Sequence, residues 1–492
     1  MKKLIEKIFH VKAKGSTIKS EIIGGLITFI AMCYILPVNA SILSDMGMNS
    51  LGVFAMTALV GAAVTFIMGF VANYPVVLSA GMGLNAYLAY TLGASSGYSW
   101  QQCMILLTIS GLIFFVFSLT PVRRIIIESI PKDLKLIISS ALGAFICFVG
   151  LKNAGVIAAD GGTLVALGNL LNPSTIIALV SIILCFGLLF CKKKMISTLA
   201  IPICILFAAI VGVITSSLMI HFGGLAQTNG VWSYTSENLA ALPVNLPIAP
   251  WLNENVSWGM SGVKDVLFFG LLDSSYGGTE FGHDLVTVLK NPTSYVAIFS
   301  LMFVNLFDTT ATLLAVGRNT GIIDENGKMN NYQKAVLADA VGAGICGPLG
   351  TSTVTSFAES NVGVEMGAKT GLAAVVAGFM FLLSAFIYPV FSIFTAGSVT
   401  APALVCVGAM IFAGNFKDIN FKDKIVTFTG FVTVIFSLLA YSIATGIGIG
   451  LIIYAIMMIF AGRRKEISTP IYVITGLFVL SFILTAVMPL LS

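Results

Sequence analysis

Two carboxylates and a run of hydroxyl side chains lie within hydrophobic sequence between residues 347 and 371, which read GPLGTSTVTSFAESNVGVEMGAKTG. Lipid cannot solvate a carboxylate or an open backbone, so such a segment is tolerated at membrane depth only where protein or a water-filled cavity surrounds it. The β-leaning residues 351–355, followed by the helix-competent residues 356–366, predict a short strand that leads into a half-helix. We therefore expect a binding site here rather than an ordinary membrane span.

Four of the 21 acidic residues lie within apolar runs and away from basic loops: Asp308, Asp339, Glu359 and Glu365. Ionisable groups inside a membrane are functional by default, and on this ground Asp308 and Glu359 are predicted to carry chemistry. Asp339 closely follows a basic loop and Glu365 lies near Lys369, so pairing with a cation is the favoured interpretation of these two. All three histidines lie outside the predicted core, so carboxylates must carry any coupled proton.

Other polar and aromatic residues could complete a site for a flat polar ligand. Asn305, Asp308 and Thr312 share one helix face because they are spaced i, i+3 and i+7 in VNLFDTTATL. A polar contact between helices would also explain such residues, and a contact with lipid or core would explain each phenylalanine. The candidate substrate contacts are Glu359, Asp308, Asn85, Asn305, Thr312, Ser360, Phe29 and Phe357, with Asp308 and Glu359 also the candidate proton carriers.

The elements that must position these residues are membrane helices. Of 492 residues, 57% are hydrophobic and only 10% are charged, and the mean hydropathy is +1.00. These values are typical of a polytopic all-α membrane protein. The eight cysteines form no CxxC pair, so we expect neither a disulfide framework nor a metal site, and no cofactor fingerprint is present. The net charge of +5 comes from basic residues in short loops, which indicates topology and not nucleic-acid binding.

Apolar runs predict fourteen passes, separated into two halves by the polar segment 221–294. The runs are 22–43, 52–72, 76–92, 102–120, 134–151, 174–191 and 197–220, then 295–316, 332–348, 352–366, 371–394, 399–414, 425–441 and 443–461. With the N-terminus in the cytoplasm, only Lys152, Lys264 and Lys290 of the 26 basic residues fall outside, which is a strong positive-inside bias. The loop 221–294 is then extracellular, and a fifteenth segment, 470–490, either spans the membrane or lies at its surface.

The two halves look like copies of one plan. A shift of 278 residues aligns Gly69 with Gly347 and Ala80 with Ala358, and it lays the Gly-rich stretch 74–85, YPVVLSAGMGLN, against the polar stretch that begins at residue 347. Seven passes in each copy give the copies opposite topology, and paired interrupted segments indicate the binding site of a transporter. We therefore predict a 7+7 inverted repeat with short strands before half-helices in passes 3 and 10.

At these residues the chain resembles the nucleobase-ascorbate (NCS2) transporter superfamily, and within it the AzgA-like adenine/guanine/hypoxanthine permeases. The matching pieces are TFIAMCYILPVNASILSD (28–45), SAGMGLNAYLAYT (79–91), FVNLFDTTATLLAVGR (303–318) and the long stretch 338–378. Carried onto this chain, the family's binding carboxylates fall on Asp308 and Glu359 and its third-pass asparagine on Asn85. The chain departs from the family where Asn305 replaces an aspartate and Ala311 a glycine.

The resemblance implies proton-coupled uptake of purine bases across the plasma membrane, by elevator-type motion of a core domain against a gate domain, in a homodimer. The implied division gives 1–120 and 295–394 to the core, 121–220 and 395–492 to the gate, and 221–294 to an extracellular loop. The partners expected are therefore a purine base, a proton, the bilayer and a second copy of the chain, with no nucleic acid.

Three further interpretations compete with purine uptake. An anion transporter of the related sulfate/bicarbonate type would have the same architecture, but its site would favour a basic residue over two carboxylates. A xanthine or uracil carrier of the same fold is the second interpretation, and a channel is the third. An enzyme is not expected, because the chain has no His-based metal set and no Ser/His/Asp arrangement.

Overall fold

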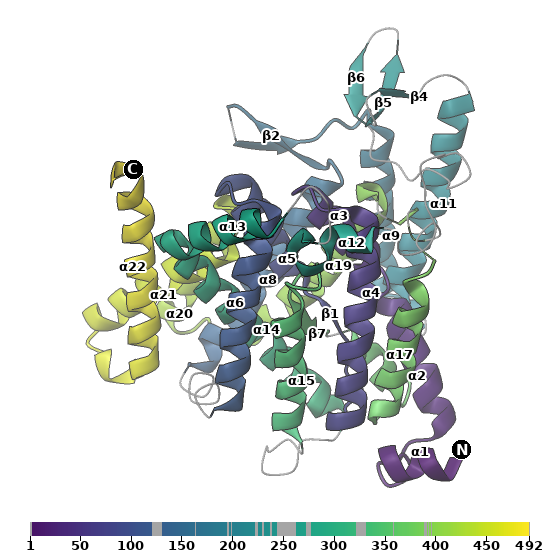
Figure 1. Ribbon diagram of the computed structural model, residues 1–492, viewed down its shortest axis with the longest axis horizontal. Coiled ribbons are helices and arrows are strands. Elements are labelled where there is room, and N and C mark those ends of the chain that lie inside the picture. Colours follow the sequence, from purple (N-terminus) through teal and green to yellow (C-terminus); the bar gives the residue numbers. More distant parts are fainter. Residues whose placement is uncertain are drawn as a thin grey trace.

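The structure is a computed structural model of the chain. It describes residues 2–120, 130–162, 164–193, 196–197, 199–221, 225–228, 231–236, 239–243, 262–271, 277–320, 331–357, 359–387, 391, 393–394 and 396–491. Within these ranges the chain is mostly helical, with a few short strands (Figure 1).

The first half of the chain supplies helices at the places where the apolar runs predict them. In chain order they are α1 (Lys2–Phe9), α2 (Ile18–Met32), α3 (Ile35–Ser44), α4 (Ser50–Ile67) with a π-helical continuation (Met68–Ala72), α5 (Met82–Ala86) with a π-helical continuation (Tyr87–Ser95), α6 (Trp100–Leu119), α8 (Lys132–Asn153), α9 (Pro173–Leu189) and α11 (Ala200–His221). Polar side chains cap several of these helices at their starts. Asn49, for example, accepts from the Gly52 amide at 3.2 Å at the beginning of α4, which satisfies one of the helix's free N–H groups.

The second half follows the same order. Its helices are α14 (Pro292–Thr320), α15 (Tyr332–Ile345), α16 (Ser360–Glu365), α17 (Gly371–Ser384), α19 (Gly397–Phe416), α20 (Lys424–Leu439), α21 (Ile443–Phe460) and α22 (Thr469–Leu491). The last of these is the fifteenth apolar segment, which the sequence leaves undecided. It is a single helix of 23 residues at the edge of the bundle (Figure 1). Its Phe478 packs edge-on against Phe299 of α14.

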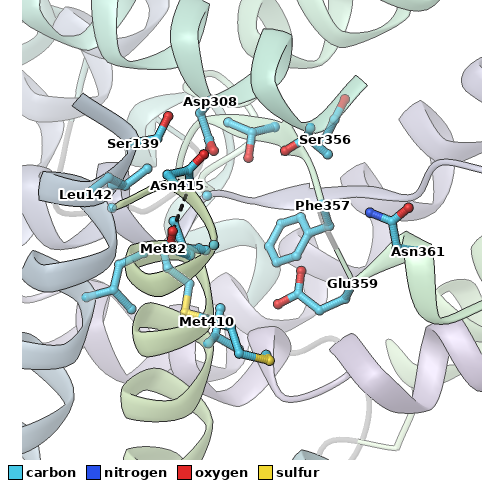
Figure 2. Close-up of a pocket in the computed structure, with 18 of the residues that line it drawn as sticks. Met82, Ser139, Leu142, Asp308, Ser356, Phe357, Glu359, Asn361, Met410 and Asn415 are labelled. Carbon is cyan, nitrogen blue, oxygen red and sulfur yellow. Dashed lines mark hydrogen bonds between the residues drawn. The ribbon is translucent and has the colours of Figure 1, made fainter. Parts of the chain in front are cut away.

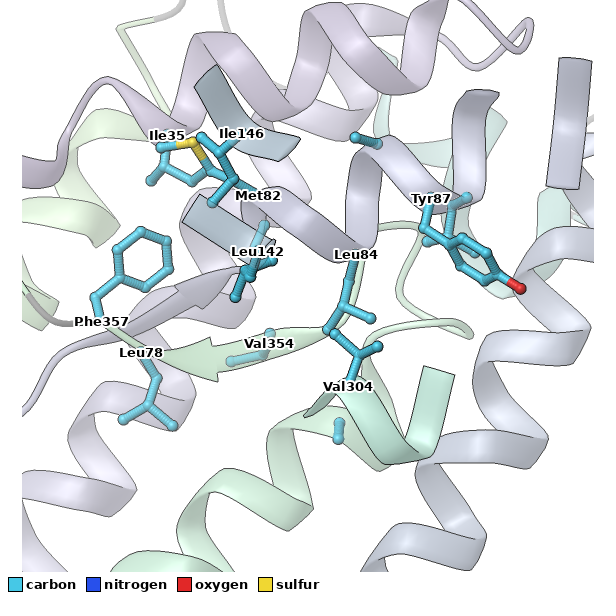
Figure 3. Close-up of a cluster of buried hydrophobic side chains, with 14 of the residues drawn as sticks. Ile35, Leu78, Met82, Leu84, Tyr87, Leu142, Ile146, Val304, Val354 and Phe357 are labelled. Carbon is cyan, nitrogen blue, oxygen red and sulfur yellow. The ribbon is translucent and has the colours of Figure 1, made fainter. Parts of the chain in front are cut away.

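Two short strands cross at the centre of the molecule, before the half-helices of the third and tenth passes. β1 (Leu78–Ala80) and β7 (Val354–Ser356) pair antiparallel, with Ser79 opposite Thr355. Side chains on these strands are buried, and Figure 3 shows Leu78 and Val354 among apolar residues of α3, α5, α8 and α14. The predicted strand and half-helix pairs are thus confirmed, and the pairing of β1 with β7 joins the two repeats at their middle.

Six described helices are both long and apolar enough to cross a membrane: α2 with α3, α4 with its continuation, α6, α8, α11 and α19. A seventh span results if α14 is counted with α13 (Gly278–Lys290), which meets it at a bend of 86°. Shorter apolar helices such as α9, α17 and α20 lie where the sequence predicts other passes. A short helix can complete a pass where the neighbouring backbone is surrounded by protein, as the half-helices and strands here are.

The helices pack in two groups. The first group contains α2, α3, α4, α5, α6, α14, α15, α16 and α17, and the second contains α8, α9, α11, α19, α20 and α21. Within the second group α8 and α19 approach each other closely, and a Cβ added to Gly143 would lie 2.6 Å from the Gly408 carbonyl oxygen. Glycine is needed at this crossing because the two backbones touch. The division of the chain into a moving core and gate, with the residue boundaries that the family resemblance implies, stays a prediction.

The segment 221–294 contains more regular structure than its composition suggests. It contributes a three-stranded antiparallel sheet of β4 (Leu225–Thr228), β5 (Val231–Ser236) and β6 (Leu239–Pro243), followed by α12 (Val263–Val266) and α13. A hairpin of β2 (Ile157–Asp160) and β3 (Leu164–Leu167) lies at the same end of the molecule, opposite the N-terminal helix (Figure 1).

Candidate functional site

A cavity of about 610 Å³ lies between the two helix groups, beside the crossing strands. This volume is within the range of small-molecule sites, roughly 300–1,000 Å³. The first helix group lines it with Gly81, Met82, Asp308, Thr312, Thr355, Phe357 and Glu359 among others, and the second with residues of α8, α11, α19 and α21. Both predicted proton carriers therefore share one hollow.

The cavity extends toward one end of the helix groups. Leu189 and Asn415, near the ends of α9 and α19, line it together with Ser197, which lies just before α11, and all three adjoin the basic loops. These loops are predicted to be cytoplasmic, so the cavity is oriented toward the predicted cytoplasmic side.

Glu359 lies in the turn between β7 and α16. Its Oε1 accepts a hydrogen bond of 2.6 Å from the Tyr34 hydroxyl, which comes from the break between α2 and α3. Figure 2 shows the Glu359 carboxylate and the Phe357 ring side by side, both directed into the cavity. A carboxylate beside a ring can accept an N–H of a flat heterocycle whose face lies against that ring.

Asp308 lies in the middle of α14 and faces the same cavity. Thr355 of β7 lines the cavity together with it. Val304 and Thr312 also line the cavity, so the exposed face of α14 follows an i, i+4, i+8 spacing. This spacing places two of the three residues of the predicted face in the cavity. The third, Asn305, is 2% exposed and is not among the lining residues, because it lies roughly 60° around the helix from Asp308.

Asn85 belongs to a buried polar network next to the cavity and does not line it. Its Nδ2 donates to Asn39 Oδ1 at 3.1 Å, and Asn39 Nδ2 donates to the hydroxyls of Thr57 at 2.8 Å and Thr351 at 3.1 Å. The hydroxyl oxygens of Thr57 and Thr351 are hydrogen-bonded to each other at 2.8 Å. This network ties α3, α4, α5 and the segment before β7 together, so the described contacts of Asn85 are structural.

Two further candidates, Ser360 and Phe29, do not line the cavity. The Ser360 hydroxyl accepts from the Val77 amide at 3.0 Å and so extends the strand crossing. Phe29 packs edge-on against Phe381 at 5.2 Å. Asp339 is buried, and its carboxylate accepts hydrogen bonds from the hydroxyls of Thr309 at 2.8 Å and Ser356 at 3.3 Å. The side chain of Glu365 lies outside the described set.

Sequence reasoning missed several residues that line the cavity or contact a residue that lines it. Tyr34 is the most important, since it contacts Glu359 directly, and its place near a proline in the first pass gave only a weak signal. Ser139, Met410 and Asn415 come from the second helix group and face Glu359 and Asp308 across the cavity (Figure 2). They are ordinary residues of apolar helices, so only the packing of the two groups identifies them.

The lining is mainly apolar and contains two carboxylates. No lysine, arginine or histidine is among the described residues that line it. This arrangement can bind a neutral, flat molecule that donates hydrogen bonds, and it disfavours an anion because like charges repel. Among the described residues, no group of three or more His, Cys, Asp or Glu side chains is placed to bind a metal ion.

Comparison with known proteins gives consistent matches. Residues 19–427 match the model of the Permease family. The chain is 35% identical to the guanine/hypoxanthine permease PbuO of Bacillus subtilis over 96% of this chain and 98% of that one. It is 31% identical to the adenine permease AdeP of Escherichia coli over 98% of this chain and 96% of that one.

Solved structures of the same fold include those of anion carriers. The transmembrane domain of the cyanobacterial bicarbonate transporter BicA matches with a TM-score of 0.55 at 15% identity, over 86% of this chain and 97% of that one. Murine Slc26a9 in its inward-facing state matches with a TM-score of 0.56 at 11% identity, over 94% of this chain and 72% of that one. At these identities the similarity shows the fold alone, which is the predicted 7+7 inverted repeat.

Proposed function

Because this chain belongs to the NCS2 family of permeases, and is thus a multi-pass membrane transporter and not an enzyme, we propose that it takes up purine nucleobases. The observation that carries the proposal is the placement of Glu359 and Asp308 in one mainly apolar cavity whose described lining contains no cation. Hypoxanthine, guanine and adenine are the substrates in question, since near-full-length relatives carry the names of permeases for these bases.

Each part of the site has a role in this proposal. Glu359, held by Tyr34, accepts a ring N–H of the purine, and the Phe357 ring lies against the purine face. Asp308 holds the coupling proton or accepts a second N–H. Protonation lowers the cost of carrying this carboxylate through a dry barrier, which couples the proton to the substrate.

The transport cycle proposed is elevator-type alternating access. The first helix group, with its two carboxylates, moves as the core against the second group as the gate, and the cavity between them opens to each side in turn. Two chains associate through the gate in the plasma membrane. The support is the separate packing of the two groups and the location of the cavity between them.

Uptake of labelled hypoxanthine in a host without its own purine carriers tests the proposal. Competition by unlabelled adenine, guanine, xanthine and uracil defines the substrate class, and a protonophore tests proton coupling. Asp308→Asn and Glu359→Gln should each reduce uptake severely at normal surface expression. Full pH-dependent uptake by both variants would show that the site is assigned wrongly.

Transport of an anion is the second candidate, because BicA and Slc26a9 share the fold. The two carboxylates of the cavity argue against it. Saturable bicarbonate or sulfate uptake, without competition by any nucleobase, would favour this candidate over purine transport.

A further inference from the structure

A cluster of aromatic and charged residues lies at the opposite end of the two helix groups from the cavity opening. Tyr90 follows α5 in the first group, and Tyr441 lies between α20 and α21 in the second. The two rings meet edge-on with centroids 5.6 Å apart. Lys152, near the end of α8, places its Nζ 4.5 Å from the Tyr90 ring centroid and 4.6 Å from the Tyr441 ring centroid. One cation thus contacts an aromatic ring from each helix group.

Hydrogen bonds connect the same two groups around this cation. The Tyr90 hydroxyl donates to Asp45 Oδ2 at 2.8 Å and lies 3.5 Å from Asn153 Oδ1. The Thr91 hydroxyl donates to the Tyr441 carbonyl oxygen at 3.0 Å. Asp45 lies at the end of α3, and its carboxylate attracts the Lys152 ammonium without forming a direct ion pair among the described contacts. The cluster therefore combines cation–π and hydrogen-bond contacts between the two helix groups, and the Asp45 carboxylate attracts the cation.

The backbone of Tyr441 indicates that the position of its ring is enforced. Its φ is +49°, in the left-handed region that a bulky side chain rarely adopts. Its ring also packs on Phe145 at 5.4 Å and Phe148 at 5.8 Å, both on α8. Its hydroxyl is buried and has no hydrogen-bond partner among the described residues, so the ring and not the hydroxyl makes the useful contacts. A strained backbone persists only where surrounding contacts hold it.

The cluster lies on the predicted extracellular side. Asp45, Tyr90, Lys152 and Tyr441 all fall at the outer ends of their passes, and Lys152 is one of three basic residues that the topology places outside. The cavity is oriented the other way, toward the basic loops. The two helix groups are thus in contact on the predicted extracellular side, and the cavity between them extends toward the predicted cytoplasmic side.

We propose that Lys152 is a positioning residue of the transport cycle, which acts through Tyr90 and Tyr441 to hold the outer path closed while the cavity faces the cytoplasm. The inference rests on the proposed alternating-access cycle. In that cycle, opening to the outside must separate the two rings and withdraw Lys152 from at least one of them. We call this cluster the outer latch, and it consists of Asp45, Tyr90, Lys152 and Tyr441. Its contacts determine the population of the outward-open state relative to the outward-closed state.

The latch can be tested by accessibility, without any substrate. Ser139→Cys places a reporter thiol in the cavity, and a membrane-impermeant maleimide is applied to the outside of whole cells. The parent chain with its native cysteines gives the background. Lys152→Gln should raise outside labelling at position 139 roughly three- to tenfold, the change expected when cation–π contacts are lost. Lys152→Arg keeps a cation over both rings and should label close to the level of Ser139→Cys alone.

Tyr441 offers a matched pair of variants. Tyr441→Phe removes a hydroxyl without a described partner and should leave labelling unchanged, whereas Tyr441→Leu removes the ring and should raise it. Asp45→Asn gives a second measurement at an exposed residue and should change labelling in the same direction as Lys152→Gln. Labelling at the level of Ser139→Cys alone in both Lys152→Gln and Asp45→Asn would overturn the proposal.

A kinetic measurement separates this role from a merely structural one. If the outward-open state becomes more populated in Lys152→Gln, the apparent KM for external purine falls while the maximum rate also falls, and Lys152→Arg restores both. An unchanged KM with a lower maximum rate would contradict the proposed role. If no purine is transported at all, the labelling result still stands, so failure of the latch and failure of the proposed substrate are distinguishable.

Discussion

The hydrogen bond from Tyr34 to Glu359 should set the affinity of the site. At 2.6 Å it has the length of a charge-assisted O–H···O bond, about 2.5–2.7 Å. Bonds to charged groups contribute about 1.5–3 kcal/mol, and about 1.4 kcal/mol is tenfold in a binding constant. Tyr34→Phe removes the donor and little else, because the Tyr34 side chain is only 2% exposed and its ring packs in the core. We expect KM for the preferred purine to rise about 10- to 150-fold, with the upper end reached only if Glu359 loses its orientation completely.

The assay is initial-rate uptake of the labelled base over a range of concentrations, normalised to surface expression. The maximum rate should change much less than KM, since the bond orients Glu359 equally in the bound state and in the transport step. Tyr441→Phe is the matched control, because it removes a hydroxyl that has no described partner, and it should leave KM unchanged.

A double-mutant cycle decides whether Tyr34 acts through Glu359. In a Glu359→Gln background, adding Tyr34→Phe should change KM little, because the charged acceptor is already lost. A KM within about twofold of the parent in the Tyr34→Phe single variant would refute the reasoning. So would full additivity of the two substitutions.

Three other predictions concern stability. Gly143→Ala should destabilise the protein by about 1–3 kcal/mol, because the added Cβ would meet the backbone of the facing helix α19. Gly187→Ala should not, because a Cβ at position 187 would meet nothing within 4 Å among the described residues beyond its own helix backbone. Thermal unfolding in detergent compares the two variants. Asn39→Ala should cost about 1–3 kcal/mol for each partner left unsatisfied, and an unchanged unfolding midpoint would contradict the network. Arg463 Nη1 lies 2.7 Å from Asp423 Oδ2, and its hydrogen bond and charge lower the pKa of that carboxyl. The contact therefore stabilises the fold at neutral pH. Its contribution disappears as the pH falls from the ordinary carboxyl pKa toward the lowered one. Arg463→Gln should therefore weaken the fall in unfolding temperature below about pH 4, and an identical pH profile would show that the pair contributes nothing.

Much of the architecture follows from the sequence because membrane helices depend on local properties. Runs of apolar residues and the placement of Lys and Arg give the passes and their predicted orientation without knowledge of packing. The polar stretch at 347–371 can also be recognised from the sequence as a binding site and not an ordinary membrane span, because carboxylates cannot face lipid. This is why Glu359 and Asp308 could be selected from 21 acidic residues, and both line the cavity.

Side-chain direction at the centre depended on tertiary structure. Asn85, Asn305 and Ser360 are polar and at the right depth, but their direction depends on how the half-helices rotate and on which neighbours compete for their hydrogen bonds. Asn39 engages Asn85, and the Val77 amide engages Ser360. A sequence indicates that a buried polar group needs a partner, but not which partner it finds.

The sequence by itself determined that this chain is a polytopic transporter with two carboxylates at membrane depth and an inverted repeat. The tertiary structure alone decided that Tyr34 holds one of them, and that Lys152 lies between rings from separate halves of the bundle. The physical reason is range. Hydropathy and charge placement act on each segment separately, whereas a hydrogen bond or a cation–π contact between residues hundreds of positions apart exists only after the two helix groups have packed.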